Sequence, residues 1–129
     1  MQQLKNKVVW ITGASSGIGE ALAYAFAQEG SRLVLSARNA GKLELVAGKC
    51  REAGVDVLVV PMDVMDLDAM EDAVRQVKER MIRVDVLVLN AGRSQRSLAI
   101  ETPVSIDRTF MELNFFSPVV LTKALLPDM

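Results

Sequence analysis

The chain has 129 residues, of which 50% are hydrophobic and 24% are charged, and its formal net charge is −1. This balance excludes the basic face that binding to nucleic acid or to an anionic membrane requires. With no histidine and one cysteine, Cys50, the chain has neither an internal disulfide nor a ligand set for zinc, so no metal site is expected. No apolar run approaches the roughly 20 residues of a membrane-spanning helix. We therefore expect a soluble, intracellular protein, with the cytoplasm favoured.

Apolar, strand-like runs alternate with amphipathic, helix-like segments along the first 90 residues. Strands are predicted over residues 8–12, 32–37, 55–61 and 84–90. Three helices are predicted between them, and the apolar stripes that should face the sheet are Ile18, Leu22 and Phe26, then Leu43, Val46 and Cys50, then Leu67, Met70, Val74 and Val77. After a loop that begins at Ala91, residues 105–113 and 117–129 form two helices, or one long helix interrupted near Pro118.

Strands that are apolar on both faces and separated by helices predict a parallel sheet covered on both sides. Right-handed crossovers then give an α/β fold with a Rossmann-like, doubly wound sheet. The alternation stops after the fourth strand and two following helices. We therefore expect residues 1–129 to form a single domain that is incomplete at its C-terminus.

The stretch TGASSGIG, residues 12–19, follows the first strand and opens the first helix. The first backbone N–H groups of a helix lack partners, and the helix dipole favours anions, so a glycine-rich turn at this place can cradle a phosphate. The glycine spacing differs both from the common G-x-G-x-x-G fingerprint and from the P-loop. The alternative is a tight turn without a ligand. The position after strand one, together with Thr12 and two serines within reach of a phosphate, favours the cradle.

The same stretch resembles the T-G-x-x-x-G-x-G cofactor motif of the short-chain dehydrogenases/reductases. Three further segments resemble motifs of that family in the same order: MDV at 62–64, NAG at 90–92 and LNFFSPVVLT at 113–122. The sequence of the last segment, together with the preceding SQRSLAIET, looks most like that of a eukaryotic branch of generic dehydrogenase/reductase members. The resemblance covers nearly the whole chain and implies an NAD(P)-binding Rossmann fold.

The resemblance implies a role for each matching residue. The residues that would bind the cofactor are Gly13, Ser15, Ser16, Gly17, Ile18, Gly19, Arg38, Asn39, Asp63, Val64, Asn90, Ala91 and Gly92. Asn114 takes the place of the Asn of the catalytic tetrad, where a local helix distortion frees a backbone carbonyl for a water in a proton relay.

Each assignment has an alternative that the sequence leaves open. Asp63 would contact adenine, or it would cap the following helix. Asn90 is a buried structural hydrogen-bonder, a ligand contact, or both. Asn114 marks either the distortion or a simple helix break before Pro118.

The second strand ends in LSARN, without the carboxylate that would hydrogen-bond the ribose hydroxyls of NAD. Arg38 stands there instead, and a guanidinium suits a 2′-phosphate, so NADP(H) is expected as cofactor and NAD(H) is disfavoured. Ser36 or Asn39 would assist. The alternative is that Arg38 is a surface arginine at a helix start.

The chemistry that the resemblance implies is hydride transfer between the nicotinamide and a carbonyl or alcohol carbon, assisted by a Ser and a Tyr-x-x-x-Lys pair. The one tyrosine, Tyr24, is followed four residues later by Gln28, so it cannot be that acid/base. We therefore expect the cofactor-binding part of an NADP(H)-dependent oxidoreductase, inactive as a 129-residue chain. The rival is a natural short form that binds nucleotide or pairs with other subunits. The two last helices resemble the family's dimer interface, which implies a homo-oligomer.

Overall fold

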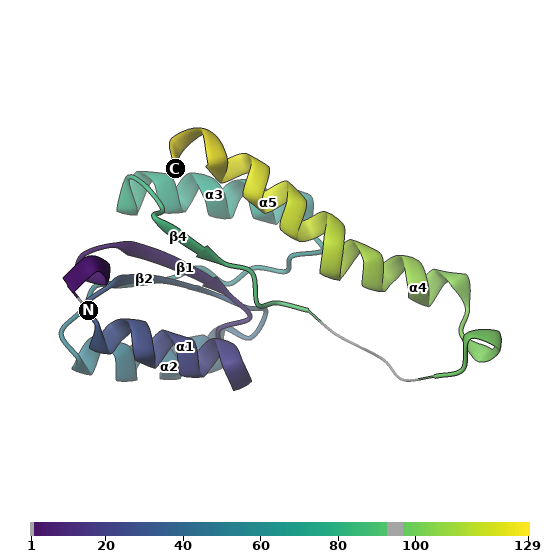
Figure 1. Ribbon diagram of the computed structural model, residues 1–129, viewed down its shortest axis with the longest axis horizontal. Helices are drawn as coiled ribbons and strands as arrows, with labels where there is room; N and C mark the ends of the chain where they lie inside the picture. The colour runs from purple at the N-terminus through teal and green to yellow at the C-terminus, as the bar shows by residue number, and fades with distance from the viewer. Residues whose placement is uncertain (1, 93–96) are drawn as a thin grey trace.

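The computed structural model describes residues 2–92 and 97–129, and its centre is a four-stranded parallel sheet. The strand order is β3-β2-β1-β4, so the chain winds outward from β1 in both directions (Figure 1). The strands are β1 Val8–Thr12, β2 Arg32–Ser36, β3 Val57–Val59 and β4 Val86–Val88. The predicted doubly wound α/β fold is confirmed, although the third and fourth strands are shorter than their apolar runs.

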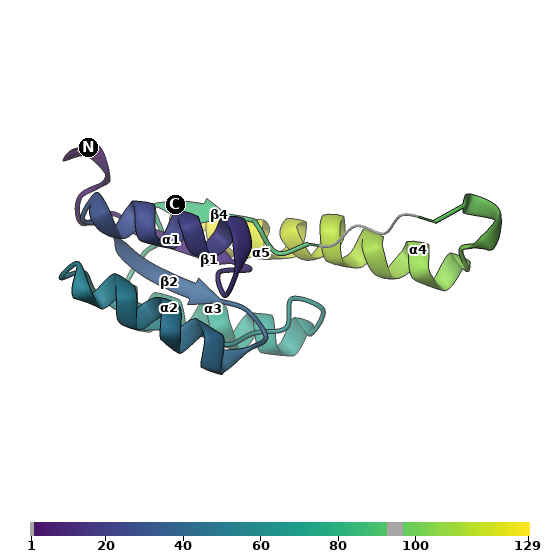
Figure 2. The same ribbon diagram turned by 90° about the horizontal axis from the view of Figure 1, so that it is seen from below.

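Helices cover both faces of this sheet. Helices α1 (Gly17–Gln28) and α2 (Ala40–Glu52) lie on one face, while α3 (Leu67–Met81) and α5 (Ser117–Leu125) lie on the other (Figures 1 and 2). Short 3₁₀ turns occupy Gln2–Leu4, Ala99–Glu101 and Leu126–Asp128. No helix among the described residues is long and apolar enough to cross a membrane.

Alternate residues of the central strands enter two separate cores. Val9, Ile11 and Leu33 pack under α1 and α2, whereas Val8 and Trp10 pack against α3 and α5. All five residues of β1 are buried because the strand has a neighbour on each side and helices on each face. This is the reason that its sequence is apolar without alternation.

Two predicted inward residues lie outside these cores. Ile18 is 72% exposed and Leu67 is 53% exposed, so the prediction that they face the sheet is wrong. The residues of α1 that are buried are Gly19, Ala23 and Ala27. Small side chains let α1 approach the sheet closely, and the larger Leu22 and Phe26 pack at the margins. The stripes of α2 and the rest of α3 are buried as predicted.

The C-terminal helices form one continuous rod. Helix α4 (Val104–Met111) passes through a π-helical turn at Glu112–Phe116 directly into α5. Pro118 lies in the first turn of α5 and does not interrupt it, so the interruption is at the π-turn. The α5 end of the rod packs beside α3, while α4 runs on beyond the sheet (Figure 1).

Candidate functional site

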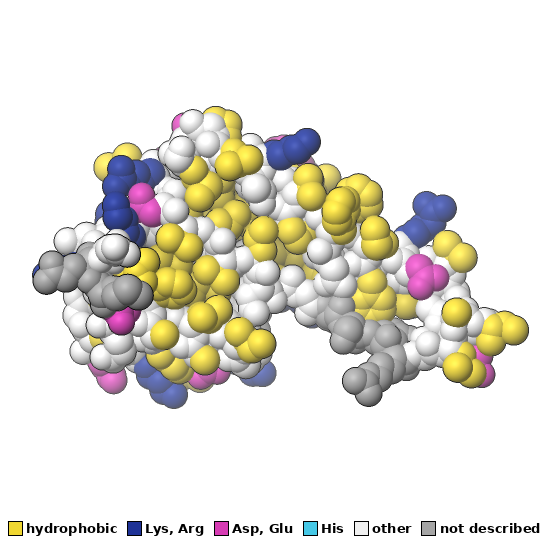
Figure 3. Space-filling model, viewed as in Figure 1, with side chains coloured by type: hydrophobic (Ala, Val, Ile, Leu, Met, Phe, Trp, Pro, Cys, Tyr) yellow, Lys and Arg dark blue, Asp and Glu magenta, His cyan; other side chains and the backbone are white. Residues whose placement is uncertain are grey.

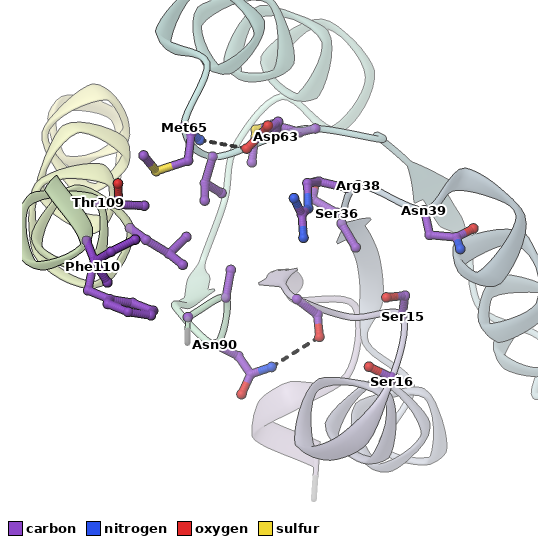
Figure 4. A pocket seen from close by; sticks show the side chains of 18 residues that line it. Ser15, Ser16, Ser36, Arg38, Asn39, Asp63, Met65, Asn90, Thr109 and Phe110 are labelled. Carbon is purple, nitrogen blue, oxygen red and sulfur yellow. Dashed lines mark hydrogen bonds between the residues drawn. The ribbon is translucent and has the colours of Figure 1, made fainter. Parts of the chain in front are cut away.

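An open cavity of about 780 Å³ lies at the carboxyl ends of the strands. This is the edge at which doubly wound sheets bind ligands. Figure 4 shows side chains from the turns after all four strands and from α4 converging on it. Ten of the thirteen predicted cofactor-binding residues line it: Gly13, Ser15, Ser16, Arg38, Asn39, Asp63, Val64, Asn90, Ala91 and Gly92. Gly17, Ile18 and Gly19 do not, and neither does Asn114.

The glycine-rich turn needs glycine at particular positions for two different reasons. Gly13 and Gly17 have positive φ angles of 67° and 57°, which L side chains adopt with strain. A Cβ at Gly19 would collide with the carbonyl oxygen of Gly13 and lie 2.7 Å from Nδ2 of Asn90. At Gly17, by contrast, no atom lies within 4 Å of the place a Cβ would take, so the backbone there is open.

The start of α1 differs from the starts of α2 and α3. Asn39 caps α2 by accepting from the Lys42 backbone N–H at 3.0 Å, and Asp66 caps α3 by accepting from Ala69 N–H at 3.1 Å. At α1 the N-cap residue is Ser16, whose side chain makes no capping hydrogen bond. The first-turn amides of α1 are therefore free of a side-chain cap, which is the arrangement that an anion can complete.

Thr12 has a structural position rather than the expected one beside a phosphate. Thr12 is buried, and its Oγ1 accepts hydrogen bonds from the backbone N–H groups of Asn90 and Ala91, each at 3.1 Å. The prediction that Thr12 reaches a phosphate is therefore wrong. The Asn90 side chain in turn donates to the Gly13 carbonyl oxygen at 3.1 Å. Asn90 thus ties β4 to the glycine-rich turn while it also lines the cavity, so its structural role is confirmed.

Arg38 lies in the turn that follows β2 and is exposed at the cavity wall. Figure 4 shows its guanidinium directed inward. Within the part of the chain that the structure describes, no carboxylate forms an ion pair with it. The two neighbouring side chains expected to assist Arg38 form hydrogen bonds within the fold instead. The side-chain oxygen of Asn39 caps α2, and the buried Ser36 accepts from Trp10 Nε1 at 2.9 Å.

Asp63 lies in the turn after β3 and is exposed to the cavity. Its Oδ1 accepts from the Met65 backbone N–H at 2.9 Å (Figure 4). The alternative that Asp63 caps the following helix is wrong, because Asp66 does so. The carbonyl of the adjacent Val64 accepts a 2.6 Å hydrogen bond from the Ser117 hydroxyl of α5.

Asn114 lies within the π-turn, so the predicted local distortion at this residue is confirmed. The Ser117 backbone N–H donates to the carbonyl of Glu112, five residues earlier. The Oδ1 of Asn114 lies 2.7 Å from the place that a Cβ on Gly92 would take. The π-turn is thereby in contact with the NAG segment even though Asn114 does not line the cavity.

Sequence reasoning missed one wall of the cavity, which α4 and the adjoining π-turn provide. The residues concerned are Ile106, Thr109, Phe110 and Leu113. Their spacing of three, four and seven positions from the first is the signature of one helical face, and that pattern was readable in the sequence. The loop residues 93–96, which were expected to lead into this helix, lie outside the described residues.

Tyr24 does not line the cavity. Its hydroxyl donates to Glu20 at 2.7 Å, and the Lys49 ammonium lies 5.8 Å from its ring centroid. Burial, together with the hydrogen bond to Glu20, raises the pKa of Tyr24 to about 12. Burial also raises the pKa of the Cys50 thiol, which lies buried on the inward stripe of α2 as predicted.

Comparisons with known proteins agree with this geometry. The family model described as short chain dehydrogenase matches residues 7–129. Dehydrogenase/reductase SDR family member 7 of Homo sapiens is 47% identical over 131 residues, which cover 98% of this chain and 39% of the relative. Dehydrogenase/reductase SDR family protein 7-like of Drosophila melanogaster is 42% identical over 131 residues, which cover 98% of this chain and 40% of the relative. Both relatives are eukaryotic dehydrogenase/reductase members, as the sequence of the last segment predicts.

Solved structures show the same likeness. L-sorbose reductase from Gluconobacter frateurii, complexed with NADPH and L-sorbose, matches with a TM-score of 0.95 and 36% sequence identity. The match covers 100% of this chain and 50% of the reductase chain. A metagenomic short-chain oxidoreductase in complex with NADP matches with a TM-score of 0.92 and 31% sequence identity. The match covers 98% of this chain and 57% of the oxidoreductase chain. The chain thus spans about two fifths of the curated relatives and half of the solved structures. It belongs to the short-chain dehydrogenase family.

Proposed function

We propose that the protein carrying this chain is an NADP(H)-dependent oxidoreductase that interconverts a carbonyl and an alcohol. The cofactor assignment rests on the position of Arg38, whose guanidinium points into the cavity and has no acidic partner among the described residues. The start of α1, which has no side-chain cap, borders the same cavity. A guanidinium in this position would hold a 2′-phosphate in a charge-assisted hydrogen bond. That two similar structures were solved with NADPH and NADP supports the assignment.

The glycine-rich turn fits the pyrophosphate of such a dinucleotide. Gly17 offers open backbone at the first residue of α1, and Ser15 and Ser16 line the cavity beside it. The uncapped first-turn amides of α1 would donate to phosphate oxygens, and the helix dipole favours the charge. Gly13 and Gly19 shape this turn, the latter by permitting contact with Gly13, and Ile18 follows as an exposed residue in the first turn of α1.

The adenine would lie against Asp63 and Val64. Because Oδ1 of Asp63 accepts from Met65, the second carboxylate oxygen is left to accept from an exocyclic amine. Asn39 lines the same cavity on the other side of Arg38 (Figure 4).

At the other end of the cavity, the NAG segment would border the ribose and the nicotinamide. Bound there, the cofactor supplies the hydride. Asn114 would act on the proton: it lies in the π-turn that contacts the NAG segment, and a backbone carbonyl of such a turn would hold a water. Asn90 keeps the NAG segment in register with the glycine-rich turn through its bond to Gly13.

The test is a calorimetric titration of the protein with NADPH and with NADH. We expect NADPH to bind more tightly, and Arg38→Asp to weaken NADPH about 10- to 100-fold while it improves NADH. Arg75→Asp is the matched control, because Arg75 is an exposed arginine of α3 that pairs with Asp72 away from the cavity. Equal affinity for both nucleotides in the unchanged protein would refute the NADP(H) assignment.

We also propose that a second copy of the protein covers the rod of α4 and α5. Large apolar side chains are exposed along it, namely Met111, Phe115, Phe116 and Val120, and Figure 3 shows hydrophobic side chains gathered on this part of the surface. Phe115 and Phe116 contact each other edge to face, with ring centroids 5.1 Å apart. Light scattering should therefore report an oligomer, and Phe116→Asp should shift it toward the monomer. A monomer in the unchanged protein would refute this.

A further inference from the structure

The Ser117 hydroxyl connects α5 to the turn after β3, which carries Asp63 on the cavity wall. Ser117 is only 3% exposed, and its Oγ donates to the Val64 carbonyl oxygen at 2.6 Å across 53 residues of sequence. Serine in a helix commonly bonds back to its own helix. Here the hydroxyl leaves α5 instead and holds a turn that follows β3.

That hydrogen bond acts on Asp63 through a single peptide unit. The carbonyl of Val64 and the N–H of Met65 belong to one planar peptide group. Ser117 holds the carbonyl end of this plane, and the N–H end donates to Oδ1 of Asp63 at 2.9 Å (Figure 4). Rotation of the plane would break both bonds together. Hydrogen bonds in such a chain also polarise one another.

Ser117 has a second connection, to the π-turn. Its backbone N–H donates to the Glu112 carbonyl and so closes the turn that contains Asn114. One residue therefore fixes the C-terminal end of the π-turn by its backbone and the Val64 peptide by its side chain.

We infer that Ser117 is a positioning residue for recognition of the adenine base, acting through the Val64–Met65 peptide on the carboxylate of Asp63. This inference rests on the proposed function, which places adenine at Asp63. A carboxylate oxygen accepts from the exocyclic amine of adenine but repels the carbonyl that hypoxanthine carries in the same place. Ser117 therefore governs the selectivity for adenine over hypoxanthine.

The test measures the affinity of the protein, at its natural length, for NADPH and for reduced nicotinamide hypoxanthine dinucleotide phosphate. We expect the unchanged protein to prefer NADPH, and Ser117→Ala to reduce the ratio of the two affinities about 3- to 10-fold. Ser117→Thr, which keeps the hydroxyl, should restore most of the ratio. In an Asp63→Asn background, Ser117→Ala should no longer change it, because the carboxylate that it orients is gone.

Ser31→Ala is the matched control. Ser31 is also a fully buried serine, and its hydroxyl donates to a distant backbone carbonyl, that of Leu4, at 2.8 Å, but it lies at the opposite end of β2 from the cavity. It should lower the melting temperature as Ser117→Ala does and leave the affinity ratio unchanged.

The outcomes separate the inference from the function on which it rests. If the unchanged protein prefers NADPH and Ser117→Ala weakens both nucleotides equally, or neither, the positioning role is wrong while the proposed cofactor stands. If the unchanged protein binds both nucleotides equally, the assignment of adenine to Asp63 is wrong and the inference is lost with it. If it binds neither, the proposed function itself is wrong.

Discussion

The side chain of Asn90 donates a hydrogen bond to the carbonyl oxygen of Gly13 at 3.1 Å, and Gly19 lies directly against both groups. The bond joins the end of β4 to the turn after β1, which are 77 residues apart in the chain. A side chain at Gly19 would push these two segments apart. The close approach of the Gly13 carbonyl group and the Asn90 side chain, rather than conformational freedom, is thus what requires glycine at position 19.

Gly19→Ala should lower the free energy of unfolding by about 1–3 kcal/mol, because the new methyl group collides with backbone that has little room to move. It should also abolish nucleotide binding, since the glycine-rich turn would shift. Chemical denaturation and calorimetry measure the two effects.

Gly48→Ala is the control for this change. Gly48 lies inside α2, and no atom lies within 4 Å of the place its Cβ would take. The substitution should stabilise the protein by about 0.5–1 kcal/mol, because alanine is the better helix former. Nucleotide binding that survives Gly19→Ala would contradict the proposed role of the turn.

Thr12→Val should destabilise the protein by about 1–3 kcal/mol, because it leaves the backbone N–H groups of Asn90 and Ala91 without their acceptor. Valine has almost the same shape as threonine, so packing changes little. Thr12→Ser keeps the oxygen and should recover most of the loss. Urea denaturation of the three proteins checks this, and equal stability of the valine and threonine proteins would show that the shared oxygen is unimportant.

The sequence predicted the sheet best where strands are buried on both faces. The bounds of β1 agree with the run Val8–Thr12, because a central parallel strand is apolar at every position. β3 and β4 each have one neighbour in the described sheet and are three residues long, although backbone hydrogen bonds from Val60 to Leu35 and from Met62 to Ala37 continue beyond β3. Hydrophobicity alone carries no information on where pairing stops.

The cavity was predicted less completely than the fold. Arg38 was predicted from the missing carboxylate after the second strand and Asp63 from the family resemblance, and both line the cavity. The wall made by Ile106 and Phe110 depends on the direction that the chain takes after the fourth strand, which no local pattern specifies. The error at Ile18 has a similar origin: the closeness of α1 to the sheet selects alanine and glycine as the buried face.

Asp56 should make stability depend on pH in the acid range. Hydrogen bonds from Arg80, and from Arg32 as well, lower the pKa of Asp56 below its usual value, although burial opposes the shift. A carboxyl whose folded pKa is depressed contributes stability above its unfolded pKa of about 3.9, and this contribution disappears as the pH falls through the folded value. Asp56→Asn should therefore lower the melting temperature at pH 7.

The same substitution should have a much smaller effect once the pH lies below the lowered folded pKa of Asp56, because Asp56 itself is then protonated. Asp72→Asn is the control, since Asp72 forms an exposed pair with Arg75 on one helix, and such pairs contribute little at any pH. A pH-independent difference between the Asp56→Asn and unchanged proteins would contradict the prediction and point to packing rather than charge.

The 129-residue polypeptide by itself should show no turnover of carbonyl or alcohol substrates with NADP(H). Its one tyrosine, Tyr24, has a pKa of about 12, donates to Glu20 and does not line the cavity, so it offers no proton to a substrate there. The absorbance of NADPH at saturating polypeptide and a panel of ketones and aldehydes gives the measurement. Tyr24→Phe is the control for any trace of activity. Loss of such activity on this substitution would mean that the tyrosine is the acid after all, whereas activity that survives it would require another proton donor among the residues of the cavity.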